Sequence, residues 1–172
     1  MKILATLIGS AALGFINTNA GRKLYVCATP QPTALDAVGY AALTWVLVGG
    51  VGNLGETGSK TNILNYETWD DDTIDKAKGL TDAGSPDLEV RRDYDDAGQV
   101  ILLAAAATNF TYALKIVGND KPNPTGTPTI RYNRGLISGP TQPNGRNEDF
   151  DIEMYSLGLQ QRQITVLPTV GA

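Results

Sequence analysis

Apolar and polar residues alternate along several short runs of this chain, and this pattern predicts β-strands. In the segment 87–92, the apolar residues Leu88 and Val90 alternate with charged residues, which is the period of two expected of a half-buried strand. The segments 112–117 and 150–155 show the same alternation. Further strands are expected in four β-rich runs, at residues 23–29, 44–51, 129–138 and 163–167.

The segment 52–72 has no sustained period of either kind, although residues 63–69 are compatible with part of a strand. A loop of this length inside a compact domain is usually functional or disordered. Its apolar residues argue against disorder, so we expect a loop that packs on a partner through Leu54, Ile63, Leu64, Tyr66 and Trp69. After it, residues 73–80 and 87–92 are expected to pair as a hairpin around the turn at 81–86.

Two short helices are expected. Residues 36–43 form the first, with Thr33 or Asp36 able to cap its N-terminus. The second follows the acidic residues Asp93, Asp95 and Asp96 and is apolar on nearly every side between residues 100 and 107. One stripe of this helix consists of Val100, Leu103, Ala104 and Ala107. A helix that is apolar all round must be covered on all sides, and one small sheet covers only one side, so we expect this helix to pack against another subunit.

Composition supports a single domain over residues 1–172 that is mainly β. Hydrophobic residues make up 42% of the chain and charged residues 19%, so the chain is neither disordered nor strongly charged. Its 19 glycines and 9 prolines favour short strands joined by loops over long helices. The Pro/Gly-rich stretch at 119–148 is expected to form surface loops that decorate this domain.

The chemistry of the chain excludes several functional classes. A net charge of −4 and a pI of about 4.7 disfavour tight nucleic-acid binding, because such binding depends on Lys and Arg neutralising phosphates. The chain has no histidine, the side chain most used for acid–base work and the commonest zinc ligand. Its single cysteine, Cys27, lies in a strand-like run and is interpreted as a small buried apolar residue. We expect no catalytic site and no cofactor.

Two motifs match functional patterns without the context that those patterns require. Residues 50–55 spell G-x-G-x-x-G, but the segment after them is typical of a loop, whereas a dinucleotide site needs a helix to begin there. The run of Asp70, Asp71 and Asp72 with Asp75 suggests calcium, but an EF-hand glycine and glutamate are missing at the required positions. A solvated acidic turn is the better interpretation, so no metal site is expected.

Residues 1–20 form an apolar arm that imitates a signal peptide, with Lys2, an apolar run and small residues at 18–20. The run is shorter than the 20 or so apolar residues needed to span a membrane, so we expect no membrane binding by this chain. We expect the arm to be retained and to be buried against the core or a neighbouring subunit.

The ordered series of segments from residue 22 to residue 117 resembles the tail tube proteins of long-tailed bacteriophages and related gene transfer particles. The resemblance is carried by residues 36–43, the turn with Gly55 and Glu56, the strand with Lys76, Lys78 and Gly79, and Arg92-Asp93 leading to Asp96-Ala97-Gly98-Gln99 and the alanine-rich helix. Each segment alone is weak evidence for this family, whereas the order and spacing of the segments together are fairly specific for it. The loops beyond residue 119 and the arm 1–20 lie outside this pattern.

The resemblance implies a β-sandwich or barrel-like domain with one flanking short α-helix and a long loop, here residues 52–72, that reaches the neighbouring ring. It also implies homo-hexameric rings that stack into a hollow tail tube conducting DNA from the capsid to the host cell. Such a protein would be assembled in the host cytoplasm and reside in the virion tail. Its partners would be copies of itself, the terminator, tape measure and distal tail proteins, and DNA in transit without sequence-specific binding.

Acidic strand faces would suit the wall of such a tube. Four candidates follow from the alternation, namely Asp87, Glu89, Asp151 and Glu153. Like charges focused in a narrow bore repel phosphates and keep DNA from adhering while it slides. Reversal of Glu89 and Glu153 to lysine is therefore expected to leave assembly intact and to impair DNA ejection.

Two other functions fit the same sequence. The tube of a contractile injection or secretion system has a similar architecture with another cargo, and sequence does not separate it from a phage tail. A secreted pilin-like or surface β-protein is supported only by the apolar N-terminal run. An enzyme is the poorest fit, since no motif lies in its required context.

Overall fold

The computed structural model of the chain describes residues 18–171. Within them lie ten strands and two helices: β1 (Lys23–Val26), α1 (Ala37–Ala41), β2 (Val46–Val48), β3 (Val51–Leu54), β4 (Lys60–Tyr66), β5 (Asp75–Asp82), β6 (Asp87–Arg91), α2 (Ala97–Ala106), β7 (Tyr112–Val117), β8 (Ile130–Thr141), β9 (Ile152–Leu159) and β10 (Ile164–Val166). Most of the predicted arm lies outside the described residues, and its last three residues, 18–20, are exposed.

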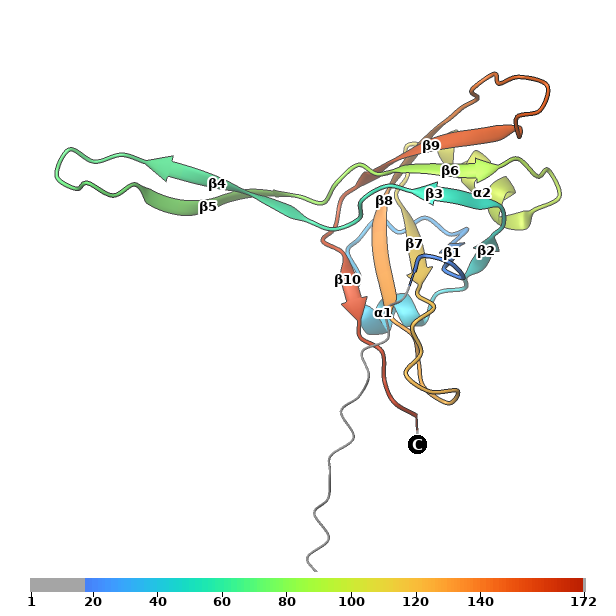
Figure 1. Cartoon of the computed structure of the whole chain (residues 1–172), viewed down its shortest axis with the longest axis horizontal. Helices are drawn as coiled ribbons and strands as arrows, with labels where there is room; N and C mark the ends of the chain where they lie inside the picture. Colours follow the sequence, from blue (N-terminus) through green and yellow to red (C-terminus); the bar gives the residue numbers. More distant parts are fainter. Residues whose placement is uncertain (1–17, 172) are drawn as a thin grey trace, which may run out of the picture.

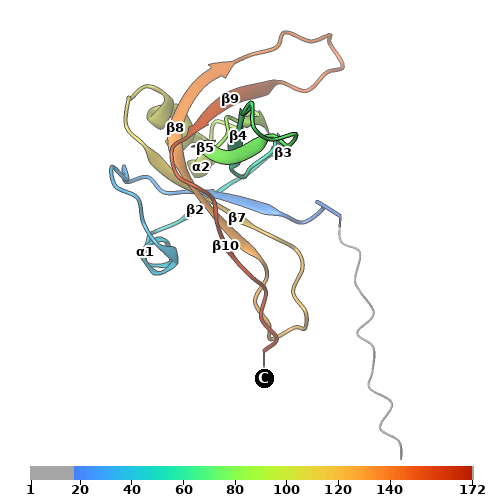
Figure 2. The same cartoon turned by 90° about the vertical axis from the view of Figure 1, so that its left-hand side faces the viewer.

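One strongly curved antiparallel sheet forms the body of the domain, in the order β2-β1-β7-β8-β9-β6-β3, with β10 paired to the start of β8 (Figures 1 and 2). Its two end strands, β2 and β3, are consecutive in sequence and separated only by Gly49 and Gly50. Gly50 has a φ of 67°, a left-handed conformation that glycine adopts readily. The prediction of a mainly β, barrel-like domain with a flanking helix is confirmed.

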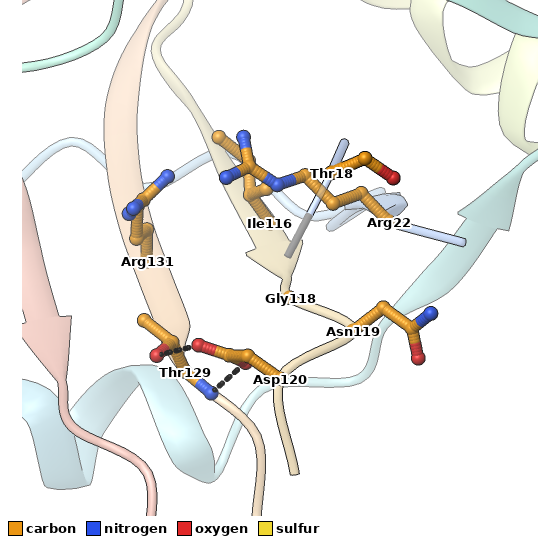
Figure 3. Close-up of a pocket in the computed structure, with 8 residues that line it drawn as sticks. All are labelled: Thr18, Arg22, Ile116, Gly118, Asn119, Asp120, Thr129 and Arg131. Atoms are coloured by element: carbon orange, nitrogen blue, oxygen red, sulfur yellow. Dashed lines mark hydrogen bonds between the residues drawn. The ribbon is translucent and has the colours of Figure 1, made fainter. Parts of the chain in front are cut away.

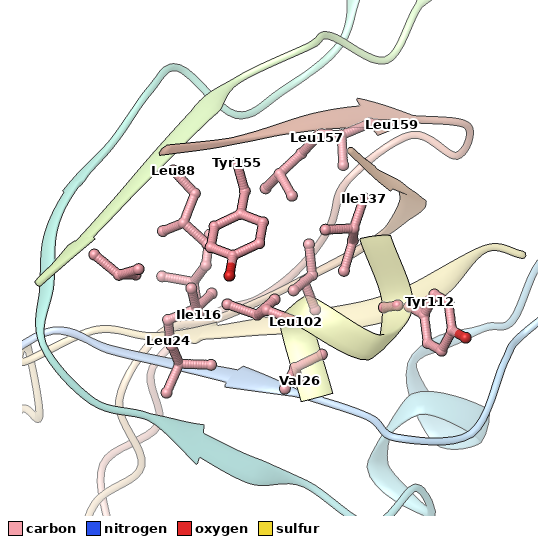
Figure 4. Packing of buried hydrophobic residues seen from close by; sticks show 14 residues of the cluster. Leu24, Val26, Leu88, Leu102, Tyr112, Ile116, Ile137, Tyr155, Leu157 and Leu159 are labelled. Atoms are coloured by element: carbon pink, nitrogen blue, oxygen red, sulfur yellow. The ribbon is translucent and has the colours of Figure 1, made fainter. Parts of the chain in front are cut away.

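The hydrophobic core lies in the concavity of this sheet and is closed by α2. Leu102 of the helix is fully buried and packs among Leu88, Tyr155, Leu157 and other side chains of the sheet (Figure 4). A second, smaller cluster covers the opposite face of β7 and β8. There Tyr40 of α1 stacks on Tyr132 with ring centroids 5.1 Å apart. The two clusters together fix α1 and α2 on opposite sides of the sheet.

Polar contacts at the start of α2 connect the helix to the turn between β2 and β3. The predicted acidic cap is present, since Asp96 accepts a hydrogen bond from the Gln99 amide at 2.8 Å. Asp96 also accepts one from the Gly49 amide at 3.1 Å. The buried Gln99 side chain donates to the carbonyls of Gly49 and Arg91, both at 2.9 Å, and accepts from the Asp93 amide. All polar atoms of this buried amide therefore have partners.

The strand pairing differs from the prediction in one region. Residues 52–72 are not a single loop, because they contain most of β3 and all of β4. β5 pairs with β4 rather than with β6, and β6 pairs with β3 and β9. The predicted turn at 81–86 is instead the point where the chain returns from the β4–β5 hairpin to the main sheet. Within the predicted decorations at 119–148, β8 extends to Thr141, three residues beyond the strand expected at 129–138.

Candidate assembly surfaces

The β4–β5 hairpin is a two-stranded sheet of its own that projects away from the body of the domain (Figure 1). It leaves β3 at Gly55, whose amide donates to the Asp87 carbonyl at 2.8 Å, and it returns to β6. Near its base, the hydroxyls of Thr61 and Thr81 are 2.8 Å apart, and Arg162 donates to Thr81 at 2.6 Å. These contacts secure the base, whereas the rest of the hairpin extends into solvent.

Most of the apolar residues predicted to contact a partner are exposed on this hairpin. Ile63, Leu64 and Tyr66 are 60%, 53% and 70% exposed. Trp69 is completely exposed in the connection between the two strands. Leu54 is the exception, because it packs against the core cluster at the end of β3 and belongs to the base. Gly55 and Glu56 also lie at the base, where Glu56 is exposed.

The stripe of α2 singled out in the sequence faces away from the core. Val100 and Leu103 are about half exposed, and Ala104 and Ala107 are exposed as well. The opposite stripe, with Leu102 and Ala105, is buried against the sheet. The domain therefore covers only one side of this apolar helix, as the sequence predicts, and the other side is a continuous apolar surface.

The convex face of β3, β6, β9 and β8 is the third open surface. Asp87 and Glu89 lie on it, as the period of two in β6 predicts, with Asp87 exposed and Glu89 partly exposed. Across the strands, Glu89 pairs with Met154 and with Asn53, and Asp87 pairs with Ser156. The Ser156 hydroxyl donates to the Asp87 carboxylate. These side chains give the face a polar and partly acidic character.

Glu153 does not lie on this face, so its assignment to an acidic wall is wrong. The alternation in β9 is present, but Tyr155 and Glu153 are the side chains that turn toward the core, with Glu153 only 7% exposed. Glu153 accepts hydrogen bonds from the Tyr155 hydroxyl at 2.7 Å and from Gln142 at 3.1 Å. Burial and this hydrogen bond raise the pKa of Tyr155 well above its usual value.

The positive partner of Glu153 is Arg92, which directly follows β6. The Nε atom of Arg92 lies 3.2 Å from a Glu153 oxygen, an ion pair that lacks the alignment of a hydrogen bond. The same guanidinium contacts Asp151 at 3.3 Å and lies over the Tyr94 ring. Asp151 is exposed, but it precedes β9 and is engaged by this ion pair.

A basic groove that the sequence did not reveal lies beside the free edge of β3. It is lined by Arg22, Lys23 and Arg131 together with Leu54 and Ile116, and Figure 3 shows the two arginines on either side of Ile116. Among residues 18–171, none of these three basic side chains forms an ion pair. The groove brings together segments more than a hundred residues apart in the chain, so no local motif indicates it.

One carboxylate, Asp120, lies at the far end of this groove. It accepts hydrogen bonds from the Thr129 amide at 2.8 Å and from the Thr129 hydroxyl at 2.5 Å. The hydroxyl bond, more than any other contact, holds the pKa of Asp120 below its usual value, and Arg131 adds to this effect. Asp120 keeps its negative charge, but the three basic side chains outnumber it, so the groove has an excess of positive charge.

Other features of the described residues bear on the prediction that the chain has no catalytic, cofactor or metal site. Cys27 is buried and unpaired with another cysteine, as expected. The G-x-G-x-x-G motif continues into β3 and the hairpin base rather than into a helix. Between residues 18 and 171, no cluster of three or more His, Cys, Asp or Glu residues is arranged to hold a metal ion. None of the described helices is long and apolar enough to cross a bilayer.

No protein-family model and no curated protein matches this sequence. Solved structures do match the fold. A chain in the structure of the sheath/tube terminator of the extracellular contractile injection system PVC aligns with a TM-score of 0.65 and 9% identity, over 90% of this chain and 99% of that chain. A chain of the PVC sheath–tube complex aligns with a TM-score of 0.63 and 10% identity, over 95% and 99%.

A third match is a chain of the sixfold-symmetrised baseplate of the anti-feeding prophage, with a TM-score of 0.62 and 9% identity, over 90% of this chain and 98% of that chain. At these identities the likeness is one of fold. All three matches come from contractile, tail-like particles and extend over nearly the whole of both chains. The chain therefore has the fold of structural proteins from phage tail-like particles.

Proposed function

We propose that this protein is a structural tail tube subunit whose homo-hexameric rings stack into a hollow tube that conducts DNA from the capsid to the host cell. The single observation that carries the proposal is the projecting β4–β5 hairpin with its exposed apolar side chains. A two-stranded hairpin is at best marginally stable alone in water, because it lacks a third layer to cover its apolar groups. A neighbouring copy supplies that layer in a ring or between rings.

The exposed stripe of α2 supports assembly independently of the hairpin. Contiguous apolar surface of this kind marks protein interfaces, since monomeric proteins seldom leave it open to water. Val100 and Leu103 would be covered by an adjacent subunit, with Ala104 and Ala107 allowing close approach. The ends of the tube would bind terminator, tape measure and distal tail proteins. In this proposal the protein is assembled in the host cytoplasm, resides in the virion tail and has no enzymatic role.

The convex face of β3, β6, β9 and β8 suits the wall of the bore. It is the polar face of the sheet, and sixfold repetition would place rings of Asp87 and Glu89 around the channel. These carboxylates would repel DNA phosphates and limit adhesion during transit. Asp151 would contribute at the edge of this wall, where Arg92 partly neutralises it.

Assembly through the hairpin is tested by shortening it. Because Thr61 and Thr81 are paired in register, an Asn-Gly turn that replaces residues 62–80 closes the hairpin next to its base without disturbing the main sheet. Light scattering of the wild-type chain should show rings and longer assemblies, whereas the shortened chain should remain a folded monomer. The substitution Asn65→Ser, on the same hairpin, serves as control and should assemble normally. Wild-type-like assembly of the shortened chain would refute the role of the hairpin.

The tube of a contractile injection system is the second candidate, and the fold matches favour it because all three come from such systems. The two candidates differ in the particle around the tube. Antibody capture of native particles that contain this chain, followed by electron microscopy, separates them. Tailed capsids with packaged DNA indicate a phage tail, whereas sheathed particles without a capsid indicate an injection device.

A further inference from the structure

We propose that the basic groove beside β3 receives the acidic tip of the β4–β5 hairpin, residues 67–75, from a second copy of the chain. This inference rests on the proposed function, because it names a contact through which identical subunits would join. The groove and the tip lie on the same polypeptide but at opposite ends of the hairpin. Their chemistry is complementary in charge and in apolar character.

Charge complementarity is the first argument. Arg22, Lys23 and Arg131 line the groove without an ion-pair partner among the described residues, and Asp120 is already bonded to Thr129. The tip has the opposite charge, with five carboxylates at Glu67, Asp70, Asp71, Asp72 and Asp75. This concentration of acidic residues at the end of a projecting arm costs electrostatic free energy unless a positive surface meets it.

Apolar complementarity is the second argument. Trp69 lies among these carboxylates and is completely exposed, which is unusual for the largest aromatic side chain. The wall of the groove contains Leu54 and Ile116, so an indole ring can cover this apolar surface while the neighbouring carboxylates reach the rim. An aromatic anchor surrounded by charged contacts is typical of the energetically important centre of an interface.

A buried amide beneath the groove gives a third, independent argument. Asn133 is only 2% exposed, and neither its oxygen nor its nitrogen has a hydrogen-bond partner among the described residues. It lies in a small cavity that shares Leu24, Leu54 and Ile116 with the groove above. Unpartnered polar atoms in the interior are costly, so their retention points to an occupant of this cavity. The cavity is about 10 Å³, enough for about one water molecule, so an indole ring docked in the groove would cover it without entering it.

Geometry assigns the tip to another copy rather than to the same chain. The groove includes Leu54, Gly55 and Thr57 at the base of the hairpin. The eight residues of β5 extend the tip away from this base by roughly 25 Å, at about 3.3 Å per residue. A tip that binds the base of the next subunit makes a head-to-tail contact, and such contacts generate closed rings or open stacks. A tube requires both arrangements, since its subunits form closed rings and these rings stack.

The test uses the full-length chain and a fluorescent peptide that spans residues 65–76. Fluorescence anisotropy should show saturable binding that weakens as salt concentration rises. Changing Asp70, Asp71 and Asp72 of the peptide to asparagine should weaken binding at least about tenfold, and the double variant R22E/K23E of the chain should do the same. Both substituted residues are exposed, so the fold should persist. The control is Arg146→Glu in the distant 142–151 loop.

A charge exchange then tests the contact within the chain itself. Light scattering should show that R22E/K23E or D70K/D72K alone prevents assembly, and that one chain carrying all four changes assembles again. A peptide that neither binds nor slows assembly would overturn the proposal. Displacement of the peptide by inorganic phosphate, with no effect of Trp69→Ala, would identify a general anion site and would also overturn it.

The outcomes separate this inference from the proposed function. If the wild-type chain forms rings or tubes and the charge reversals have no effect, the groove is not the docking site and the tube assignment stands. If the wild-type chain is monomeric at every concentration while the peptide still binds in a charge-dependent way, the docking site stands and the tube assignment fails.

Discussion

Charge reversal at Glu153 and Glu89 separates the buried from the exposed carboxylates of the barrel. The two residues lie on adjacent, paired strands, and the sequence pattern assigns both to one acidic wall. In the structure their side chains point to opposite faces of the sheet. Glu153 is buried beside Arg92 and Tyr155, whereas Glu89 lies on the open convex face. Lysine at position 153 therefore places an ammonium group against a guanidinium whose remaining partner is the exposed Asp151 carboxylate.

The magnitude follows from these contacts. Removing one partner of a buried ion pair costs about 3–5 kcal/mol, because the other charge is left without compensation. For a domain of this size each kcal/mol corresponds to roughly 2–4 °C in melting temperature. E153K should therefore lower the melting temperature by roughly 6–20 °C, a large part of the total stability of a typical domain. E89K replaces a surface charge and should change stability by less than about 0.5 kcal/mol.

Thermal unfolding followed by circular dichroism measures both variants at one protein concentration, which matters because assembly raises apparent stability. Glu153→Gln is a useful intermediate, since it keeps the shape of the side chain and removes only the charge. It should melt between the wild type and E153K. A melting temperature of E153K within about 2 °C of wild type, equal to that of E89K, would show that Glu153 is not held in a buried network.

Three further substitutions test the packing and the polar contacts of the body. Gly98→Ala should cost about 1–3 kcal/mol, because the added Cβ would lie 2.7 Å from a backbone carbon of β2; Gly158→Ala, with ordinary contacts, is the control for the same thermal melt. Asp120→Asn should destabilise the protein at neutral pH, because wild type gains stability from the ionised Asp120 and loses it only as the pH falls below 3.8 and through the lowered pKa of this carboxyl group. Thermal melts of the two proteins should therefore converge in acid. A difference in melting temperature that stays constant across this pH range would contradict the role of Thr129. Asn133→Leu should raise the stability of the isolated subunit by about 1 kcal/mol, because it removes two unpartnered polar atoms. Urea unfolding measures this change. A loss of stability would show that the amide has partners.

Sequence reasoning recovered the features that depend on local chemistry. The alternation in β6 places Leu88 and Val90 inward and Glu89 outward, because side chains on a strand point to opposite faces by geometry. The N-cap of α2 at Asp96 is likewise a local hydrogen bond that a short motif indicates. The exposed stripe of α2 follows from a helix that is apolar on more sides than one sheet covers.

The remaining features depend on partners that are distant in sequence. The period of two in β9 shows that Glu153 and Met154 face opposite ways, but the period alone does not show which of them is buried. That choice is made by Arg92, which precedes Glu153 by about sixty residues and neutralises it in the interior. The pairing of β4 with β5 was missed because their polar, two-sided strands lack a hydrophobic pattern that specifies register.

Electron cryomicroscopy of the purified full-length chain at high concentration shows directly whether identical copies assemble. We predict sixfold rings with a central channel, stacked into tubes, with the β4–β5 hairpin crossing from each subunit to another copy. A chain that remains a dispersed monomer under these conditions, with its hairpin and the outer stripe of α2 open to water, would contradict this prediction.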